Sequence, residues 1–245
     1  MNEIKIEIWG DFACFSRPES KVERLTYPVI TPSAARGILS AVYSKPVEFY
    51  WQIRQIEVLK PIRYATFKRN EVINSKISKK NMEILKDGWQ IFVDETTVKT
   101  IDSNGKEKKT GTEHRTQRQT VALRDVRYRI TAEIIPRPDF KGTVNQLYEQ
   151  AKRRIHSGKC FFQPSLGLRE FVCYFDEATD DEPINESMDI GFMLYDVFDL
   201  HKYEVTKTAE PYVSVFHAVL ENGVMNVPDF DSSEVLKPER GGSDA

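Results

Sequence analysis

The middle part of this sequence is rich in basic and aromatic side chains, which can contact phosphates and stack on nucleobases. Lysines and arginines recur there in short clusters, at Lys68-Arg69, Lys76, Lys79-Lys80, the stretch 106–118 and Lys152-Arg153-Arg154. Exposed cations of this kind contact phosphates, and aromatic rings such as Phe161 and Phe162 offer faces on which nucleobases stack. The combination favours a protein that binds single-stranded or structured RNA.

The distribution of charge along the chain points the same way. The whole sequence is nearly neutral, with 35 Lys and Arg against 37 Asp and Glu. Residues 60–174 carry 24 basic against 13 acidic side chains, whereas residues 175–245 carry 4 against 17. A middle segment this basic suggests a local anionic partner, with nucleic acid the first choice. The alternative is that basic loops and an acidic tail are simply solvated surface.

Metal-dependent and nucleotide-hydrolysing chemistry lacks its usual sequence signatures. The four histidines are scattered, without the spacing that ligands of one metal ion show. The sequence contains neither a G-x-x-x-x-G-K-[ST] phosphate-binding loop nor a G-x-S-x-G nucleophile motif. We therefore expect no metal and no cofactor.

Cysteine usage and hydropathy indicate the cellular compartment. Cys14, Cys160 and Cys173 are an odd number without C-x-x-C spacing, which argues against a disulfide framework or a structural zinc site. The start of the chain lacks the apolar stretch of a signal peptide, and the apolar runs are too short to span a bilayer. We expect a cytoplasmic protein that does not bind membranes.

The first elements are expected to be a strand and a helix. Residues 3–9 alternate between charged and apolar types, which predicts a half-buried strand that ends at Gly10-Asp11. Thr31 and Pro32 suit the cap and first turn of a helix that stops before Lys45-Pro46. We expect a buried stripe of Ala35, Ile38, Leu39 and Val42, and a second, exposed stripe of Arg36, Ser40 and Tyr43.

The remaining pattern completes a strand–helix–strand–strand–helix–strand order. Extended segments are expected at 47–60, 62–68 and 120–135, a helix at 143–157 and a further strand at 166–175. Thr143 and Gln146 have the spacing of a capping box at the start of that helix. This order is the ferredoxin-like, or RRM-like, plan. The polar stretch 94–119 is an insertion in it, either a protruding hairpin or a mobile arm.

The C-terminal part is expected to form a smaller unit. Residues 176–189 have the composition of a linker, and 190–228 contain short strands with a hairpin turn at Asn222-Gly223. We therefore predict an α+β protein with an RRM-like domain over 1–175, a small antiparallel β domain over 190–230 and a flexible tail over 238–245.

Three segments resemble one known family. They are Lys21–Tyr27 running into Thr31–Leu39, Arg69–Val72 followed by Ser75–Ile77, and Gly158–Phe171. Met193–Asp196 and Ala218–Gly223 match the C-terminal part of the same family. The sequence is similar to CRISPR-associated (Cas) protein family five, in its subtype I-C ("five-d") variant, within the RAMP superfamily.

The resemblance implies a role in CRISPR antiviral defence. It implies an RRM-like domain followed by a smaller antiparallel sheet, and binding of the CRISPR repeat RNA and its 5′ handle. It further implies assembly with the backbone and large subunits of the crRNA-guided Cascade complex, which is the only route to target DNA. Members of subtype I-C generally also cleave precursor crRNA without a metal, by attack of a ribose 2′-hydroxyl on the adjacent phosphate. Such a site needs a proton acceptor or donor and a cation facing the developing charge.

The resemblance also implies catalytic positions. The family's tyrosine at the end of the first helix matches Tyr43, although a tyrosine at such a place can also simply pack its ring on the surface. The family's lysine position falls on Gln146, which is neither a cation nor a proton-transfer group at neutral pH. We therefore expect slow or absent cleavage with intact RNA binding, unless a nearby cation such as Lys141 takes the place of the lysine.

Two functions remain open, with an unrelated RNA-binding protein as a third. One is a metal-independent endoribonuclease that matures crRNA and then holds its 5′ end. The other is a subunit that only binds and caps the crRNA while another enzyme cuts. The residues that we expect to contact RNA are basic or aromatic: Arg24, Arg36, Lys68, Arg69, Lys76, Lys106, Lys108, Lys109, Arg115, Arg118, Lys152, Arg153, Arg154, Phe161 and Phe162.

Overall fold

The computed structural model of the protein describes residues 3–20, 23–72, 98–101, 107–110, 115–203 and 211–238. Within these ranges the chain is an α+β protein whose sheets are antiparallel. Its elements are β1 (Glu3–Ala13), β2 (Arg24–Leu25), α1 (Pro32–Val42), β3 (Phe49–Val58), β4 (Tyr64–Val72), β5 (Val98–Ile101), β6 (Glu107–Thr110), β7 (Arg115–Pro136), α3 (Val144–His156), β8 (Tyr174–Glu177), β9 (Met188–Asp196), β10 (Ser214–Leu220) and β11 (Val224–Asn226).

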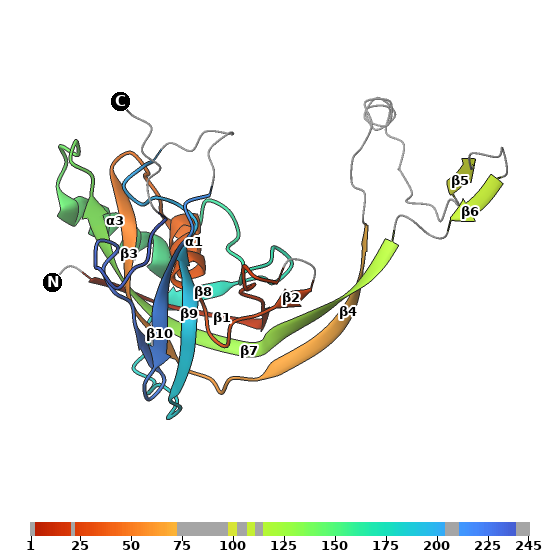
Figure 1. The fold of residues 1–245 in the computed structure, drawn as a ribbon. Helices are drawn as coiled ribbons and strands as arrows, with labels where there is room; N and C mark the ends of the chain where they lie inside the picture. The colour runs from red at the N-terminus through yellow and green to blue at the C-terminus, as the bar shows by residue number, and fades with distance from the viewer. Residues whose placement is uncertain are drawn as a thin grey trace. The chain divides into compact units, whose positions relative to one another are not determined.

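The main sheet is built around the long strand β7 (Figure 1). Its strand order is β11-β3-β7-β1-β8, and β2 and β4 also pair with β7. Ile130 in β7 lies opposite Ile6 of β1 on one side and Ile56 of β3 on the other. Because side chains alternate between the faces of a strand, this register brings the three isoleucines to the same face of the sheet.

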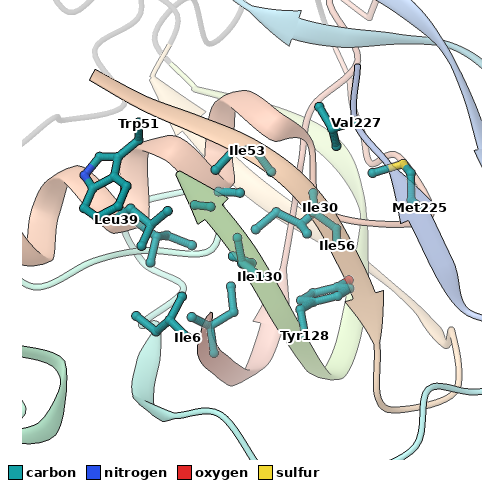
Figure 2. Close-up of a cluster of buried hydrophobic side chains, with 14 of the residues drawn as sticks. Ile6, Ile30, Leu39, Trp51, Ile53, Ile56, Tyr128, Ile130, Met225 and Val227 are labelled. Carbon is teal, nitrogen blue, oxygen red and sulfur yellow. The ribbon is translucent and has the colours of Figure 1, made fainter. Parts of the chain in front are cut away.

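The core joins that face to buried residues of both helices. Figure 2 shows the part of it in which Ile6, Ile56 and Ile130 of the sheet lie near Leu39 of α1. In α1, Ile38 and Leu39 are buried as the helical spacing predicts, and in α3 Leu147 and Ile155 are buried in the same cluster. The hydroxyl of Thr31 accepts a hydrogen bond from the Ala34 backbone N–H at 3.2 Å, so the predicted N-cap of the first helix is confirmed.

Strand β1 is longer than the sequence pattern indicated. It continues through Gly10, where the strand was expected to end, and stops at Ala13. The glycine serves close packing rather than a turn, because a Cβ on Gly10 would lie 2.5 Å from the Leu166 side chain and 2.6 Å from the Val172 carbonyl oxygen. The predicted strand at 166–175 is correspondingly short, since only Tyr174–Glu177 pairs with β1.

The predicted capping box at the start of α3 is wrong. Thr143 is the N-cap residue, yet its side chain makes no capping hydrogen bond within the described residues. The Gln146 backbone N–H instead donates to the Thr143 carbonyl oxygen at 3.0 Å. The Gln146 side chain is exposed and remains available for other contacts.

The acidic segment after β8 is not a free linker. The Thr179 hydroxyl donates to Glu7 at 2.8 Å, and Arg127 and Asp181 form an ion pair at 2.7 Å. The Ile184 N–H donates to the Val58 carbonyl oxygen. These bonds fasten the segment to β1, β7 and the end of β3, because its acidic and hydroxyl groups meet partners on the sheet.

The predicted turn at Asn222-Gly223 is confirmed, with φ angles of 49° and 77°. The strands on its two sides nevertheless join different sheets. β10 pairs with β9, whereas β11 pairs with β3 at the edge of the main sheet. The hydrophobic residue Met225 of β11 is accordingly part of the main core (Figure 2).

The chain divides into two compact units, residues 1–65 with 121–245 and residues 66–120. In the second unit, β5 pairs with β6 in antiparallel register from Val98 opposite Thr110 to Ile101 opposite Glu107. This pairing supports the hairpin interpretation of the 94–119 insertion, although its proposed turn at Asn104-Gly105 lies outside the described residues.

Among the described residues none of the three cysteines forms a disulfide, and Cys14 and Cys173 are buried. Burial raises the pKa of the Cys173 thiol to about 12, so this thiol is inert at neutral pH. In the described part of the chain, neither helix has the length and hydropathy needed to cross a membrane.

Candidate functional site

A cavity of about 800 Å³ lies between the end of α1, the loop before α3 and one side of α3. The three predicted catalytic positions, Tyr43, Lys141 and Gln146, all border it. Arg154 and Phe161 border it too. We call it the tyrosine cavity; its complete lining is Tyr43, Lys45, Val47, Glu48, Asp139, Phe140, Lys141, Gly142, Gln146, Leu147, Gln150, Arg154 and Phe161.

Tyr43 is buried, with 3% of its surface exposed, so the expectation of an exposed side chain is wrong. The helical stripe did not apply because Tyr43 is the C-cap residue, with an extended backbone at φ −148° and ψ 122°. This conformation turns the ring away from the exposed stripe. The ring packs on Phe49 at a centroid distance of 5.4 Å, and the Tyr43 carbonyl accepts a hydrogen bond from the Trp51 indole at 2.8 Å.

Three charged side chains influence the Tyr43 hydroxyl. Burial raises the pKa of Tyr43 above its ordinary value. The positive charges of Lys45 and Arg154 oppose this rise in pKa, and the negative charge of Glu48 adds to it. With a raised pKa, the hydroxyl keeps its proton at neutral pH and can donate it.

Lys45 and Glu48 are cavity residues that the sequence analysis missed. The Lys45 ammonium lies 2.9 Å and 3.0 Å from the two carboxylate oxygens of Glu48. Both side chains are partly exposed, so solvent or a ligand can reach the pair. Their short spacing after Tyr43 was the available signal, but Lys45-Pro46 was interpreted only as the end of the helix.

Arg154 is fixed at the wall of the tyrosine cavity. Its Nε donates to the Val42 carbonyl oxygen at 2.6 Å, and its guanidinium carbon lies 4.1 Å from the centre of the Phe161 ring. The Phe161 N–H donates to the Ala41 carbonyl oxygen at 2.7 Å. The last turn of α1 therefore positions both the cation and the aromatic ring.

The basic cluster on α3 does not act as one patch. Lys152 lies 3.6 Å from Glu149 and borders a different cavity, which is lined by Lys5, Arg129 and Glu177 among others. The Arg153 guanidinium donates to Gln150. Only Arg154 of the three borders the tyrosine cavity.

Two other predicted RNA contacts are held by ion pairs within the protein. Arg36 on α1 binds Asp196 of β9 through two hydrogen bonds of 2.5 Å and 3.0 Å. Arg24 lies 3.5 Å from Glu170. Such pairs reduce the charge that either arginine can offer to a phosphate.

The remaining predicted contacts are spread over the chain. Lys68 and Arg69 lie in β4, Lys108 and Lys109 in β6, and Arg115 and Arg118 in β7. Lys76 and Lys106 lie outside the described residues. Phe162 is 64% exposed and borders a further cavity beside α1.

The three described histidines each lie beside a carboxylate, and none of them borders the tyrosine cavity. His156 lies 3.0 Å from Glu177, His201 lies 2.8 Å from Asp231 and His217 lies 3.1 Å from Asp189. His114 falls outside the described residues. Among the residues that the structure places, no group of three His, Cys, Asp or Glu side chains could hold a metal ion.

Comparison with known proteins identifies relatives over nearly the whole chain. The Cas5d family model, described as "CRISPR-associated protein (Cas_Cas5)", matches residues 3–240. Two similar proteins are both named "CRISPR pre-crRNA endoribonuclease Cas5d". One, from Mannheimia succiniciproducens, is 39% identical over 96% of this chain and 99% of its own length; the other, from Thermus thermophilus, is 34% identical over 98% of each.

The fold has known counterparts as well. A solved structure described as "Crystal Structure of CRISPR-associated Protein" superposes with a TM-score of 0.60 at 17% sequence identity, covering 96% of each chain. At this identity the likeness concerns the fold alone. The family match and the two relatives, taken together, show that the chain belongs to the Cas5d family of CRISPR-associated proteins.

Proposed function

We propose that this protein binds CRISPR repeat RNA and cleaves precursor crRNA in the tyrosine cavity without a metal ion. The observation that carries the proposal is the gathering of Tyr43, Lys45, Glu48 and Arg154 around one open cavity. The names of the two relatives, both pre-crRNA endoribonucleases, support the substrate and the reaction.

The residues suit cleavage by the RNA's own 2′-hydroxyl. In this reaction the 2′-oxygen forms a bond to the adjacent phosphorus, and the bond from phosphorus to the 5′-oxygen breaks. The 2′-hydroxyl proton passes to the Glu48 carboxylate, and the Tyr43 hydroxyl donates a proton to the departing 5′-oxygen. Lys45 and Arg154 face the negative charge that develops on the phosphate. The products are a 2′,3′-cyclic phosphate and a 5′-hydroxyl end.

Gln146 stands at the family's lysine position, so another residue has to supply the cation that faces the phosphate. Gln146 borders the cavity but carries no charge, so it can only donate a hydrogen bond through its amide. Lys141 borders the same cavity from the loop before α3 and is the substitute that the sequence offered. Lys45 and Arg154 are held at the chain segment around Tyr43, because Lys45 pairs with Glu48 just after Tyr43 and Arg154 donates to the carbonyl of Val42, the residue before it.

We further propose an RRM-like layout for the first part of the chain. The order β8-β1-β7-β3 with α1 and α3 in the two crossovers supports it, because this is the strand order of the ferredoxin-like plan. The chain belongs to a CRISPR-associated family, and we propose the crRNA-guided Cascade complex, with its backbone and large subunits, as the assembly in which the protein works.

A subunit that binds crRNA without cutting it is the second candidate. The uncharged side chain at position 146 favours it, because a missing cation weakens stabilisation of the transition state. Both candidates predict binding of the repeat hairpin, and they differ in whether the RNA is cut.

Incubation of the purified protein with labelled cognate repeat RNA in EDTA tests the proposal. We expect one cut per repeat and a 2′,3′-cyclic phosphate on the upstream fragment. Binding without any cut would leave the capping function, and absence of preference for the cognate repeat over poly-uridine would overturn both.

A further inference from the structure

A second cavity, of about 200 Å³, lies on the other side of the segment that follows α1. Tyr43, Lys45 and Val47 border the tyrosine cavity, whereas Ser44 and Pro46 border the second one. The residues of this segment therefore alternate between the two cavities, and neighbouring Cα atoms are only about 3.8 Å apart. The same short piece of chain thus forms the wall between the cavities. An RNA strand that crosses this segment would therefore contact both cavities.

Aromatic rings and arginines line this second cavity, which we call the aromatic cavity. Its lining is Arg36, Ser40, Ser44, Pro46, Phe49, Tyr50, Trp51, Arg137, Phe198, Asp199, Leu200, Lys202 and Tyr203. Phe198 and Tyr203 are 43% and 49% exposed. Large aromatic surfaces left open beside a cavity are the usual means of stacking a planar ring.

The arginines of this cavity are held in place by the protein. Arg137 donates through Nε to the Pro46 carbonyl oxygen at 2.9 Å and through one terminal nitrogen to the Leu200 carbonyl oxygen at 2.8 Å. Its guanidinium carbon lies 5.3 Å from the centre of the Tyr50 ring and 5.8 Å from that of Tyr203. A guanidinium so fixed between two rings extends their flat surface.

Arg36 is equally committed, since it binds both oxygens of Asp196 and lies over the Phe198 ring at 5.5 Å. Neither arginine is therefore arranged as a phosphate clamp, which would require a free bidentate face. The hydroxyls of Ser40 and Ser44 border the cavity and can donate or accept hydrogen bonds at the edge of a ring.

From this arrangement we propose that the aromatic cavity binds one unpaired nucleobase of the RNA, next to the phosphate that is cut in the tyrosine cavity. The cavity is smaller than the range of about 300–1,000 Å³ found for drug-sized ligands, which suits a single ring system. The base would stack on Tyr203 and Phe198 and meet the serine hydroxyls with its edge. This inference rests on the proposed function. The base lies beside the cut only if the cut occurs in the tyrosine cavity, which shares a wall with the aromatic cavity.

Abasic scanning of the repeat RNA tests the site. A series of repeat RNAs, each lacking one base near the cut, is assayed for binding to the wild-type protein and to Tyr203→Ala. We expect one abasic position to weaken wild-type binding about tenfold, within the range for loss of one base–aromatic stack. The same RNA should bind Tyr203→Ala no more weakly than intact RNA does.

Two further variants serve as controls for this interpretation. Phe198→Ala should behave like Tyr203→Ala, and Phe192→Ala, which removes a 60% exposed ring of β9 outside both cavities, should behave like the wild type. If no single abasic position matters, or if its cost is unchanged in both Tyr203→Ala and Phe198→Ala, the inference is wrong. Failure of the wild type to bind intact repeat RNA would instead remove the proposed function.

Discussion

The tyrosine cavity and the aromatic cavity share a wall but differ in how their charged groups are held. In the aromatic cavity both arginines are bound by carbonyl or carboxylate oxygens of the protein. In the tyrosine cavity Lys45 also pairs with a carboxylate, that of Glu48, but both of these side chains are partly exposed. Arg154 donates through its Nε to the Val42 carbonyl and places its guanidinium over Phe161. The two neighbouring cavities therefore suit different tasks. Accessible charges suit the breaking of a phosphodiester bond, and fixed flat surfaces suit the binding of a nucleobase.

Removing the Arg154 cation from the tyrosine cavity should have the largest effect. We expect Arg154→Ala to slow cleavage by about 10²–10³, the usual cost of losing one group that stabilises the transition-state charge. Repeat binding should change far less. Single-turnover rates measure the first quantity and a binding titration the second.

Lys152→Ala is the matched control, because Lys152 lies on the same helix but borders a different cavity. Equal loss of rate in both variants would mean that α3 contributes general charge and that the tyrosine cavity has no special role.

Removing the proton acceptor should have the next largest effect. Glu48→Gln keeps the size of the side chain but cannot accept the 2′-hydroxyl proton, so we expect a rate reduced by about 10²-fold or more. Lys45→Ala, measured beside it, separates the effect of losing the Glu48 carboxylate from the effect of losing its ion-pair partner. If Glu48→Gln cuts at the wild-type rate, Glu48 only holds Lys45 and another group takes the proton.

Adding a cation at position 146 should have a smaller effect of the opposite sign. Because Lys45 and Arg154 already serve the site in this account, we expect Gln146→Lys to speed cleavage by no more than about tenfold. A gain of about 10²–10³ would show that the natural site lacks its main cation. Lys141→Ala, measured beside it, should leave the rate nearly unchanged.

Basic residues outside both cavities should affect binding alone. We expect Lys106, Lys108 and Lys109, replaced together by Ala, to reduce the slope of log binding constant against log salt by about 0.7–0.9 for each lost phosphate contact. The cleavage rate of bound RNA should stay the same. An unchanged slope in a folded variant would place the RNA contacts elsewhere.

The order of the elements could be predicted from the sequence because each depends on local pattern. Alternation gave β1, and the spacing of apolar residues with Thr31 as cap gave α1. Tyr43 and Gln146, the two positions that the family resemblance assigned to the site, border the same cavity.

The missed features depend on three-dimensional contacts that the periodicity of the sequence does not encode, whether the partners are near or far along the chain. Tyr43 is buried because the backbone leaves helical geometry at that residue and its ring meets Phe49. Gly10 continues a strand because Leu166 packs against it, far along the chain. Glu48 is a candidate because its carboxylate binds the Lys45 ammonium, and both residues border the same cavity as Tyr43. No sequence motif indicates this contact.

The central claim is that the Tyr43 hydroxyl acts in the cut, and one comparison tests it directly. Wild-type protein and Tyr43→Phe are mixed in excess with labelled repeat RNA in EDTA, and the single-turnover rate and binding constant are measured between about pH 7 and about pH 9. Burial raises the pKa of Tyr43, so the wild-type hydroxyl stays protonated over this range and its contribution should not decline. We predict equal binding and a rate at least about 10²-fold lower for Tyr43→Phe throughout. Equal rates for the two proteins would contradict the assignment of the cut to this cavity.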